Sequence, residues 1–460
     1  MSQKPTIPKG TRDFSSFEIA RRNYILQIIK SKFEIYGFSP IETPSFENRE
    51  TLMGKYGEEG DRLIFKILDS GDFLKKVSPE SLKEKDLSKI IPQISGKALR
   101  YDLTVPFARY VVQHQNELDF PFKRYQIQNV WRADRPQKGR FREFLQCDAD
   151  IVGSDSLWQE VELVQLYDRV FSELKLQGTT IKVNHRKILA GIAENIGESD
   201  KLIPFTTSLD KLDKIGQEGV KKEMLEKGIS AEAISKMEAL FSLSGSFLDK
   251  IEQLKKILSS SKTGMEGIAE LEFIHKATEK NPLISAMLDM DVTLARGLDY
   301  YTGSIFEVLP PQGIKMGSIG GGGRYDDLTG IFGMKGLSGT GISFGLDRIY
   351  LVLEEMKLFP ESLTESTKVL FLNFGEKEAE YCFKTLTALR DHGIPAELYP
   401  DAAKMKKQMN YANKRGIPFV ILAGSKEMEQ KKFTLKNMES GTQDQLSEEE
   451  LTQKLKALMP

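Results

Sequence analysis

Alternation between apolar and polar residues in the segment from Ala98 to Gly153 constrains the fold more than any other feature of this sequence. Much of LRYDLTV, PFKRYQIQNVWRAD and FREFLQCDADIVG alternates aromatic or β-branched residues with polar ones. A period of two is typical of half-buried antiparallel strands, which have one face in a core. We therefore expect a fold built on an antiparallel sheet.

Helical patterns flank these strands. Residues 17–36 predict an amphipathic helix that ends at Tyr36-Gly37, and residues 156–175 repeat apolar positions at helical spacing. Residues 188–284 are rich in Lys, Glu and Leu with helical periodicity, which predicts an inserted helical module. Residues 68–95 are rich in Lys, Asp and Ser, and this composition predicts a solvated insertion or loop.

Strand patterns resume after the helical module and change again towards the C-terminus. Residues 301–309 predict a strand, and GTGISFGLDRIYLVLEEM predicts a short strand followed by a helix. A linker near residues 359–367 precedes a segment in which strands alternate with helices over about 90 residues. This alternation predicts a separate, small α/β domain.

Composition excludes several classes of protein. The 65 Lys+Arg and 66 Asp+Glu residues give a net charge of −1, which argues against a polybasic nucleic-acid coat but leaves room for local basic patches. Two distant cysteines and four scattered histidines argue against a disulfide scaffold and a His/Cys metal site. The start, MSQKPTIPKGTRDF, lacks the apolar stretch of a signal peptide, and the longest uncharged run, residues 336–346, is too short to cross a bilayer. We expect a cytoplasmic protein without membrane association.

The segment from Lys123 to Arg142 carries seven basic residues and one acid, Asp134. Its order is a strand, a polar loop containing Pro and Gly, and a second strand. Arginines at a strand end and in a hairpin loop suit phosphate binding, because a guanidinium group can bind two phosphate oxygens, or a phosphate and a carboxylate. A solvated hairpin with surface charge explains the composition equally well.

Two glycine-containing segments are further candidates for a binding site. LARGLDYYTG at 294–303 combines an arginine, a carboxylate and two tyrosines. GGGGRYD at 320–326 has four consecutive residues without side chains, where a flat ligand can lie against the backbone. Gly339, Gly341 and Gly345 are one residue off the dinucleotide-binding fingerprint. The alternative for residues 294–303 is an ordinary turn with an Arg–Asp surface pair. The alternative for the glycine-rich segment is a flexible turn.

Two weaker patterns complete the set. If LRYDLTVP is a strand, Asp102 and Thr104 share one face, where a carboxylate and a hydroxyl can hold an ammonium group. Residues 404–432 carry eight basic and two acidic residues with Tyr411 and Phe419 between them, as an RNA-binding surface does. Taken alone, each pattern is better explained by an exposed strand position or a solvated helix face.

Taken together and in this order, the segments resemble the histidyl-tRNA synthetase family of class II aminoacyl-tRNA synthetases. PKGTRDF resembles the N-terminal signature, FEIYGFSPIETPSFE resembles motif 1, and VWRADRPQKGRFREFLQCDADIVG resembles motif 2. GISFGLDRIYLVL resembles motif 3, and LARGLDYYTG resembles a histidine-specific signature. The segment from Lys368 onward resembles the class IIa anticodon-binding domain.

The resemblance implies an α+β class II catalytic domain over residues 1–358, a helical insertion at 188–284 and an α/β anticodon-binding domain at 366–460. It implies activation of L-histidine by ATP to histidyl-adenylate, followed by transfer of histidine to the 3′ end of tRNA(His). Mg²⁺ is implied as a cofactor that bridges the ATP phosphates, with no protein side chain assigned to it. Motif 1 implies a homodimer.

The resemblance also implies roles for three arginines. Arg132 should bridge the histidine carboxylate and the α-phosphate, Arg296 should contact the same pair from the other side, and Arg348 should bind the γ-phosphate end and cover the adenine. Adenylate formation needs such cations, because charge on the phosphoryl group must be neutralised. The further residues implied for ATP are Arg140, Phe144 and Gly345.

For the amino acid, the resemblance assigns one set to the α-amino group and another to the imidazole. The first set is Asp102, Thr104 and Gln146; the second is Asp150 and Tyr301, with Tyr300 and Tyr325 nearby. A polar pocket of this kind rejects analogues, because buried groups left unpaired are costly. The common bacterial R-P-E-G-T is here Arg100-Tyr-Asp-Leu-Thr104, which resembles the archaeal and eukaryotic type with a carboxylate one methylene shorter. Arg135 and Gln137 should face the tRNA acceptor stem.

Two other functions compete with the synthetase interpretation. One is a synthetase-like regulatory paralogue of ATP phosphoribosyltransferase, which lacks the C-terminal domain and degrades the arginine motifs. The other is an RNA-binding or signalling relative with a dead active site. This chain retains Arg132, Arg296 and Arg348 together with a C-terminal domain, which favours the enzyme.

Overall fold

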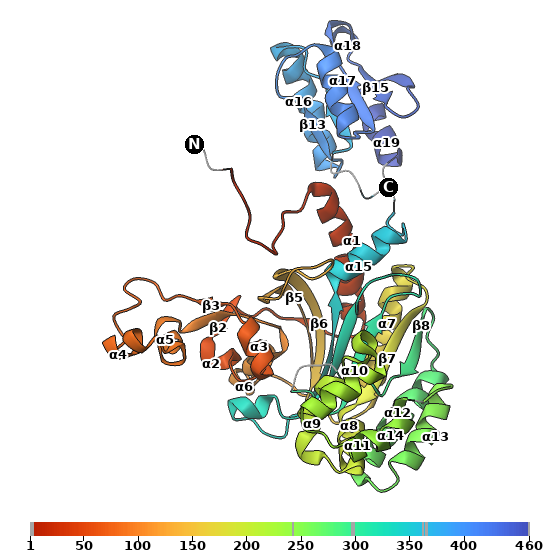
Figure 1. The fold of residues 1–460 in the computed structure, drawn as a ribbon. Helices are drawn as coiled ribbons and strands as arrows, with labels where there is room; N and C mark the ends of the chain where they lie inside the picture. Colours follow the sequence, from red (N-terminus) through yellow and green to blue (C-terminus); the bar gives the residue numbers. More distant parts are fainter. Residues whose placement is uncertain (1–3, 242, 296–299, 361–362, 364–366, 459–460) are drawn as a thin grey trace. The chain divides into compact units, whose positions relative to one another are not determined.

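The computed structural model of this chain describes residues 4–241, 243–295, 300–360, 363 and 367–458. The chain divides into two compact units (Figure 1). The first combines residues 1–14 and 22–359, and the second combines residues 15–21 and 360–460. Among the helices of the described residues, none has the length and apolar character that a membrane crossing requires.

The first unit is built on an eight-stranded sheet of order β1-β5-β6-β11-β10-β9-β7-β8. Its central pairs are antiparallel, whereas β1 is parallel to β5 and β7 is parallel to β8. The strands are β1 Ser39–Pro40, β5 Phe122–Trp131, β6 Glu143–Val152, β7 Thr179–His185, β8 Ala286–Met290, β9 Ser304–Leu309, β10 Gly320–Tyr325 and β11 Gly339–Gly345. The predicted antiparallel sheet is confirmed.

One face of this sheet is apolar and carries the core of the first unit. Its buried side chains include Tyr125, Cys147, Ala149, Ile151 and Phe344. Two helices pack aromatic rings against Phe344. The ring of Phe33 in α1 (Ser16–Ile35) lies 5.8 Å from the Phe344 ring, and the ring of Tyr167 in α7 (Trp158–Glu173) lies 4.8 Å from it. Burial of each such side chain contributes about 1.5–3 kcal/mol, so this face anchors the sheet.

The opposite face of the same strands is polar. Antiparallel register places Arg124 of β5 opposite Asp150 of β6, and Gln128 opposite Gln146. Residues directly opposite each other share a face, so the period of two that places the apolar residues in the core also brings these polar residues together.

The four glycines Gly320–Gly323 are not a flexible turn, which was the alternative considered for them. They belong to β10, which pairs with β9 on one side and β11 on the other. A Cβ atom on Gly322 would lie 2.2 Å from the carbonyl oxygen of Gly341. The absence of side chains therefore allows close packing of the strands in the middle of the sheet.

A group of helices lies between β7 and β8 in the sequence and clusters beside these two strands (Figure 1). It comprises α8 Arg186–Ile196, η1 Ser199–Lys201, α9 Leu202–Leu209, α10 Leu212–Glu226, α11 Ala231–Lys236, α12 Glu238–Phe241, α13 Phe247–Ile257 and α14 Lys262–Lys280. Local signals start some of these helices, as in α13, where Ser246 and Asp249 form a capping box. The helical character predicted for residues 188–284 is confirmed.

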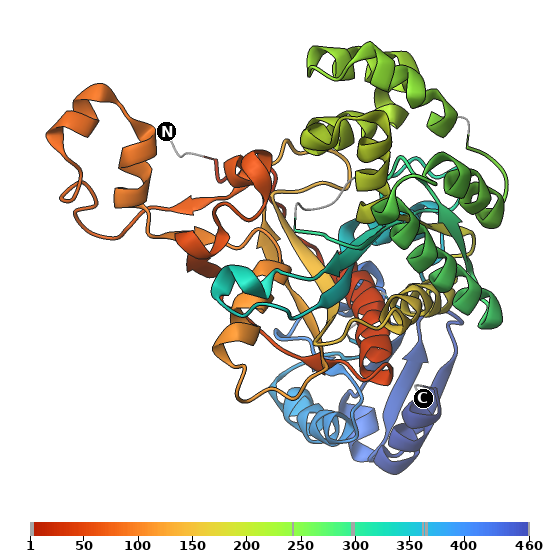
Figure 2. The same ribbon diagram turned by 90° about the horizontal axis from the view of Figure 1, so that it is seen from below.

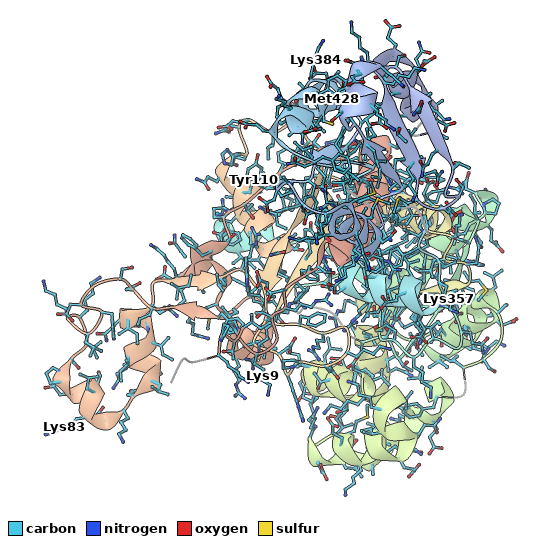
Figure 3. The ribbon with its side chains drawn as sticks, turned by 90° about the horizontal axis from the view of Figure 1, so that it is seen from above. Lys9, Lys83, Tyr110, Lys357, Lys384 and Met428 are labelled. Carbon is cyan, nitrogen blue, oxygen red and sulfur yellow. The ribbon has the colours of Figure 1, made fainter. Side chains whose placement is uncertain are left out.

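The prediction of a solvated insertion or loop at residues 68–95 is wrong in part. This segment contains α4 (Pro79–Glu84) and α5 (Leu87–Ile94), which start at the N-caps Ser78 and Asp86. Short polar side chains that cap a helix also occur in loops, so composition alone did not separate the two. Both helices project from the rest of the first unit, with Lys83 towards the far end of the projection (Figures 2 and 3).

A small sheet of order β2-β4-β3 connects this projection to the main sheet. Its strands and the remaining helices of the first unit are β2 Phe46–Asn48, α2 Arg49–Leu52, α3 Gly57–Leu63, β3 Lys66–Ile67, β4 Lys97–Leu99, α6 Thr104–Gln113, η2 Thr329–Phe332 and α15 Leu346–Glu355. The predicted strand and helix in GTGISFGLDRIYLVLEEM are confirmed as β11 and α15.

The expectation that Asp102 and Thr104 share one face of a strand is wrong. Strand β4 ends at Leu99, and Thr104 is the first residue of α6. An Asp102 Oδ1 atom accepts a hydrogen bond of 3.2 Å from the backbone N–H of Val105, as a helix-capping carboxylate does. The alternation in LRYDLTV arises from a short strand, a turn and a helix start.

The second unit has its own five-stranded sheet of order β13-β12-β14-β15-β16. Its elements are β12 Val369–Phe371, α16 Glu376–Asp391, β13 Ala396–Leu398, α17 Met405–Lys414, β14 Phe419–Leu422, α18 Ser425–Glu429, β15 Phe433–Asn437, β16 Gln443–Leu446 and α19 Glu448–Leu458. Val369 and Phe371 pack with α16 and α19, whereas Leu370 packs with α17, so both faces of β12 are covered. The predicted α/β alternation is confirmed, and α18 and β16 were not predicted.

Candidate active site

Two adjoining cavities open on the polar face of the large sheet. The larger has a volume of about 460 Å³ and the smaller about 40 Å³. Four residues line both cavities, namely Gln146, Tyr301, Gly321 and Ser343. A ligand in the small cavity can therefore reach a ligand in the large one without leaving the protein.

Glycines form part of the floor on which these cavities rest. Gly341 of β11 is opposite Asp150 of β6 and opposite Gly323 of β10. A Cβ atom on Gly341 would lie 2.1 Å from the Asp150 Oδ1 atom. An alanine there would displace the carboxylate, so this glycine sets the position of an acidic side chain as well as the shape of the floor.

The small cavity is acidic, and Asp102 forms one side of it. Its carboxylate accepts hydrogen bonds from the hydroxyls of Tyr56, at 2.8 Å, and Tyr300, at 3.0 Å. Burial raises the pKa of Asp102, while the hydrogen bond from Tyr56 and the charge of Arg132 act in the opposite direction. Thr104 lines the same cavity, so the two residues predicted to act together do meet, although through a helix start.

Asp150 lies at the other side of the small cavity and is held by two partners. The Arg124 Nη2 atom lies 2.8 Å from one carboxylate oxygen, and the Tyr325 hydroxyl donates to the other at 2.7 Å. Arg124 and Asp150 are both buried, with side chains 0% and 3% exposed. Burial raises the pKa of Asp150 and the Arg124 charge opposes this shift. A buried ion pair with an additional hydrogen bond fixes the orientation of this carboxylate.

Arg132 lies at the end of β5 and lines the large cavity. Its Nε donates a 3.0 Å hydrogen bond to the Tyr101 carbonyl oxygen, and its guanidinium carbon lies 4.3 Å from the Tyr101 ring and 5.2 Å from the Phe144 ring. Among the described residues, no carboxylate forms an ion pair with Arg132. The guanidinium group is therefore oriented by its surroundings while its charge remains available to an anion.

Arg348 approaches the large cavity from α15. Its Nε donates to the Gly139 carbonyl oxygen at 3.1 Å and its Nη1 donates to the Ser318 carbonyl oxygen at 2.6 Å. Phe144 and Gly345 line this cavity as well. The structure thus brings together Arg132, Arg348, Phe144 and Gly345, as the resemblance implies for an ATP site.

The basic hairpin does not act as one phosphate-binding cluster. Arg124 pairs with Asp150, Lys123 binds Glu162 at 2.6 Å, and Arg140 forms a bidentate pair with Asp134 at 2.8 Å and 3.0 Å. Arg140 and Asp134 line the large cavity, whereas the exposed Arg135 and Gln137 of the hairpin loop do not. Charge counting did not reveal this division, because two of the three partners, Asp150 and Glu162, lie on another strand and on a helix.

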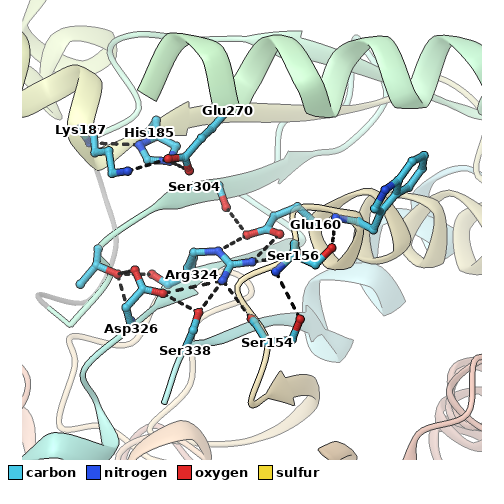
Figure 4. A network of polar contacts seen from close by, with 12 residues as sticks. Ser154, Ser156, Glu160, His185, Lys187, Glu270, Ser304, Arg324, Asp326 and Ser338 are labelled. Carbon is cyan, nitrogen blue, oxygen red and sulfur yellow. Dashed lines mark hydrogen bonds and ion pairs between the residues drawn. The ribbon is translucent and has the colours of Figure 1, made fainter. Parts of the chain in front are cut away.

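The segment that carries the two tyrosines is anchored by a polar network (Figure 4). The Thr302 N–H donates to the Arg324 carbonyl oxygen at 2.8 Å, and the Thr302 hydroxyl donates to Asp326 at 2.6 Å. The Arg324 side chain forms two hydrogen bonds with Glu160 of α7, at 2.5 Å and 2.7 Å. This network fixes the backbone next to Tyr301, whereas Arg296 lies outside the described residues.

Several residues of the site were not singled out from the sequence. They are Asp148 and Ser343, which line the small cavity, and Tyr56 and Arg124, which hold Asp102 and Asp150. The signal for Asp148 was present, because Gln146, Asp148 and Asp150 alternate along β6 and so share one face. Tyr56 is distant in sequence from Asp102 and carried no such signal, whereas Arg124 was counted among the seven basic residues of the hairpin without a role of its own.

Two family models match this chain. A family model described as histidyl-tRNA synthetase matches residues 70–349, and a model described as an anticodon binding domain matches residues 368–458. The first match covers the strands that form both cavities, and the second covers the second unit's sheet.

Individual proteins match over almost the whole chain. A histidine–tRNA ligase from Christiangramia forsetii is 69% identical over 97% of this chain and 98% of its own, and one from Flavobacterium johnsoniae is 62% identical over 96% and 97%. Among solved structures, a histidyl-tRNA synthetase from Nostoc sp. PCC 7120 has a TM-score of 0.81 at 29% identity, with all of both chains covered. An ATP phosphoribosyltransferase regulatory subunit/histidyl-tRNA synthetase from Bacillus halodurans C shares the fold, with a TM-score of 0.71 at 20% identity over 92% of this chain and 99% of its own.

Proposed function

The chain belongs to the histidyl-tRNA synthetase family, and from this premise we propose that it activates L-histidine with ATP to histidyl-adenylate and transfers histidine to the 3′ end of tRNA(His). One observation of the structure carries the proposal. The acidic small cavity and the arginine-lined large cavity share four lining residues, so an ammonium-bearing amino acid and a nucleotide phosphate can meet. The regulatory-paralogue alternative is less supported, because relatives 62–69% identical over nearly the full length are histidine–tRNA ligases.

In the large cavity, we assign Arg132 to the histidine carboxylate and the α-phosphate. An in-line attack of the carboxylate on the α-phosphorus concentrates negative charge between the two groups, and an oriented guanidinium stabilises that charge. Arg348 would take the γ-phosphate end and Phe144 one face of the adenine, with Arg140 and Gly345 beside the nucleotide. Arg296 is assigned to the opposite side of the reacting groups on the resemblance of its motif.

In the small cavity, we assign Asp102, Thr104 and Gln146 to the α-ammonium group, and Asp150 and Tyr301 to the imidazole. The carboxylates are acceptors, and an ammonium group supplies three N–H donors. Tyr300 and Tyr325 would act through the carboxylates that they bind rather than on the substrate. An analogue without ring N–H groups would leave Asp150 unpaired in a buried site, at a large cost.

ATP as the substrate implies Mg²⁺, which we propose as the cofactor and which would supply positive charge beside the phosphates. The donor set fits this arrangement, because Mg²⁺ commonly uses one or two carboxylates together with phosphate oxygens. Glu307 of β9 and Asp347 of α15 both line the large cavity, and Asp347 binds Arg12 at 2.5 Å and also pairs with Arg22. Carboxylates of this lining would help to hold the metal, which would supply positive charge that neutralises the phosphates.

The tRNA is proposed to contact both units. Arg135 and Gln137, exposed in the hairpin loop, would face the acceptor stem. In the second unit, α17 and its flanks expose Lys404, Lys406, Lys407, Lys414 and Arg415, which suit a phosphate backbone. This unit also has an open groove lined by residues including Lys384 and Met428 (Figure 3). We further propose that the protein is a cytoplasmic homodimer. Its proposed domains are a catalytic domain at 1–358, a helical insertion within it at 188–284 and an anticodon-binding domain at 366–460.

The decisive test of this function is histidine-dependent ATP–pyrophosphate exchange by the full-length protein. We expect exchange with histidine, no exchange with glutamine at the same concentration, and charging of tRNA(His). If the protein binds ATP but catalyses no exchange with histidine, it is not a histidine–tRNA ligase.

Removal of residues 366–460 should separate activation from charging. We expect exchange to change little, because both cavities belong to the first unit. Charging of tRNA(His) should fall by about 100-fold, since contacts remote from the reacting groups contribute to positioning. Thermal unfolding of the truncated protein is the control, because residues 15–21 group with the second unit. Equal loss of both activities in a folded protein would contradict the proposed role of this unit.

A further inference from the structure

Asp148 occupies the centre of the acidic side of the small cavity. It lies on β6 between Gln146 and Asp150, on the same face as both, and opposite Ser343 of β11. Asp148 is 3% exposed and lines the cavity.

The unpartnered polar atoms at this point of the cavity are acceptors. Asp148 Oδ1 and Gln146 Oε1 are buried and have no hydrogen-bond partner among the described residues. Buried oxygens left in this state are costly, which indicates that a ligand supplies the donors. Arg124 does not do so: its Nη2 pairs with Asp150, its Nε and Nη1 are buried without a hydrogen-bond partner of their own, and it does not line the cavity.

The charges around the cavity are also unbalanced. Three carboxyl groups line it, Asp102, Asp148 and Asp150, and no Lys, Arg or His side chain of the described residues does. Arg124 compensates Asp150 from behind, which leaves two carboxyl groups for one α-ammonium group. Among the described residues, a proton bound together with the amino acid brings the charge of the cavity closer to balance.

We propose that Asp148 is a specificity-determining residue whose carboxyl group shares one proton with the substrate imidazole, so that the ring is held between Asp148 and Asp150. The inference rests on the proposed function. The ring donates one N–H to Asp150, and the shared proton lies between its other nitrogen and Asp148. Tyr301, which lines the same cavity, then contacts the ring without taking a nitrogen of its own. No other bond is formed or broken on binding, and above neutral pH the proton comes from solvent.

The electrostatic surroundings agree with a carboxyl group that exchanges a proton near neutral pH. Burial raises the pKa of Asp148 to about 7, and the charge of Arg124 acts in the opposite direction. The other ionisable groups that face it are Asp150, Asp102, Tyr301, Tyr167 and the neighbouring Cys147. The pKa values of the two tyrosines and of the thiol are raised, so these groups stay neutral in this range.

The sign of the pH effect follows from counting protons. At pH 8 a carboxyl group with a pKa of about 7 is mostly ionised, and free imidazole, with a pKa of ~6.5, is mostly neutral. A complex that holds one shared proton must then take up about 0.9 proton per histidine bound. The dissociation constant for histidine therefore rises with pH above 7, by up to about tenfold per unit.

Isothermal titration of the full-length protein with histidine at pH 8, in phosphate and in Tris, measures this proton uptake from the different ionisation enthalpies of the buffers. We expect close to one proton for the wild type and less than about 0.2 for Asp148→Asn, which keeps the shape but cannot ionise. Asp155→Asn, an exposed change after the same strand, is the matched control and should behave like the wild type.

The outcomes separate this inference from the function on which it rests. Absence of histidine binding and of exchange in the wild type would refute the function itself. Binding by the wild type without proton uptake, or equal uptake by Asp148→Asn, would overturn the role of Asp148. If the variant does not fold, the wild-type titration decides alone, because the shared proton requires uptake at pH 8. A purely structural role for Asp148 would weaken binding without changing the proton count.

Discussion

Replacement of Arg132 by alanine should lower the rate of histidine-dependent ATP–pyrophosphate exchange by about 100- to 1,000-fold, equivalent to roughly 3–4 kcal/mol of transition-state stabilisation. The guanidinium group is oriented in advance by the Tyr101 carbonyl oxygen and by the rings of Tyr101 and Phe144. Because its position is fixed before reaction, little reorganisation is needed when charge develops on the phosphoryl group. The loss should therefore appear mainly in kcat rather than in KM.

The neighbouring arginine of the same hairpin provides a matched control. Arg135 is exposed and does not line the large cavity. Arg135→Ala should leave exchange within about twofold of the wild type and lower tRNA charging, because only the second step uses the acceptor stem. Near-normal exchange by Arg132→Ala, or equal losses in the two variants, would contradict the assignment of Arg132 to the reacting groups. The folded state of each variant is checked by its unfolding transition.

The central sheet was predictable from the sequence for a clear physical reason. Alternation along β5 and β6 encodes two faces, and the same alternation places Tyr125 and Cys147 in the core while it places Arg124 and Gln146 on the polar side. The strand–helix alternation of the second unit was equally informative. Local patterns therefore identified these elements and which strand positions share a face.

Contacts between distant segments were not predictable in the same way. Tyr56, which directly precedes α3, donates a hydrogen bond to Asp102. Glu160 of α7 binds Arg324 of β10. Nothing in the local sequence of either partner indicates the other, because the pairing arises only when the sheet forms. The short helix start at Thr104 was also mistaken for a strand, since three or four residues do not distinguish a period of 2 from one of 3.6.

Glycine positions illustrate how much a sequence pattern leaves open. The run Gly320–Gly323 was considered as a ligand floor or as a flexible turn. In the structure it is a paired strand in which Gly322 lets β11 approach closely, while Gly321 lines both cavities. Composition indicated that side chains are absent there, but only the register of the strands determines which glycine faces the ligand.

Replacement of Glu160 by alanine should lower the free energy of unfolding by about 3–5 kcal/mol, because it leaves a buried guanidinium with only the more distant and half-exposed carboxylate of Asp326, at 3.7 Å. The Arg324 side chain is 5% exposed and that of Glu160 is 0% exposed. Ser338 accepts a further hydrogen bond from Arg324 at 2.5 Å, but a hydroxyl cannot replace the lost charge. Denaturant unfolding of the first unit measures the effect.

The same substitution should affect catalysis through the segment that carries Tyr301. The Thr302 N–H donates to the Arg324 carbonyl oxygen, so a displaced Arg324 loosens the wall of the small cavity and should raise the KM for histidine more than the KM for ATP. Glu232→Ala is the control, because it breaks an exposed pair with Lys236 on a helix surface and should cost less than about 0.5 kcal/mol. If Glu160→Ala and Glu232→Ala unfold at the same denaturant concentration, Arg324 is not held by its buried ion pair. If stability falls while both KM values stay unchanged, the network supports the fold but does not position Tyr301.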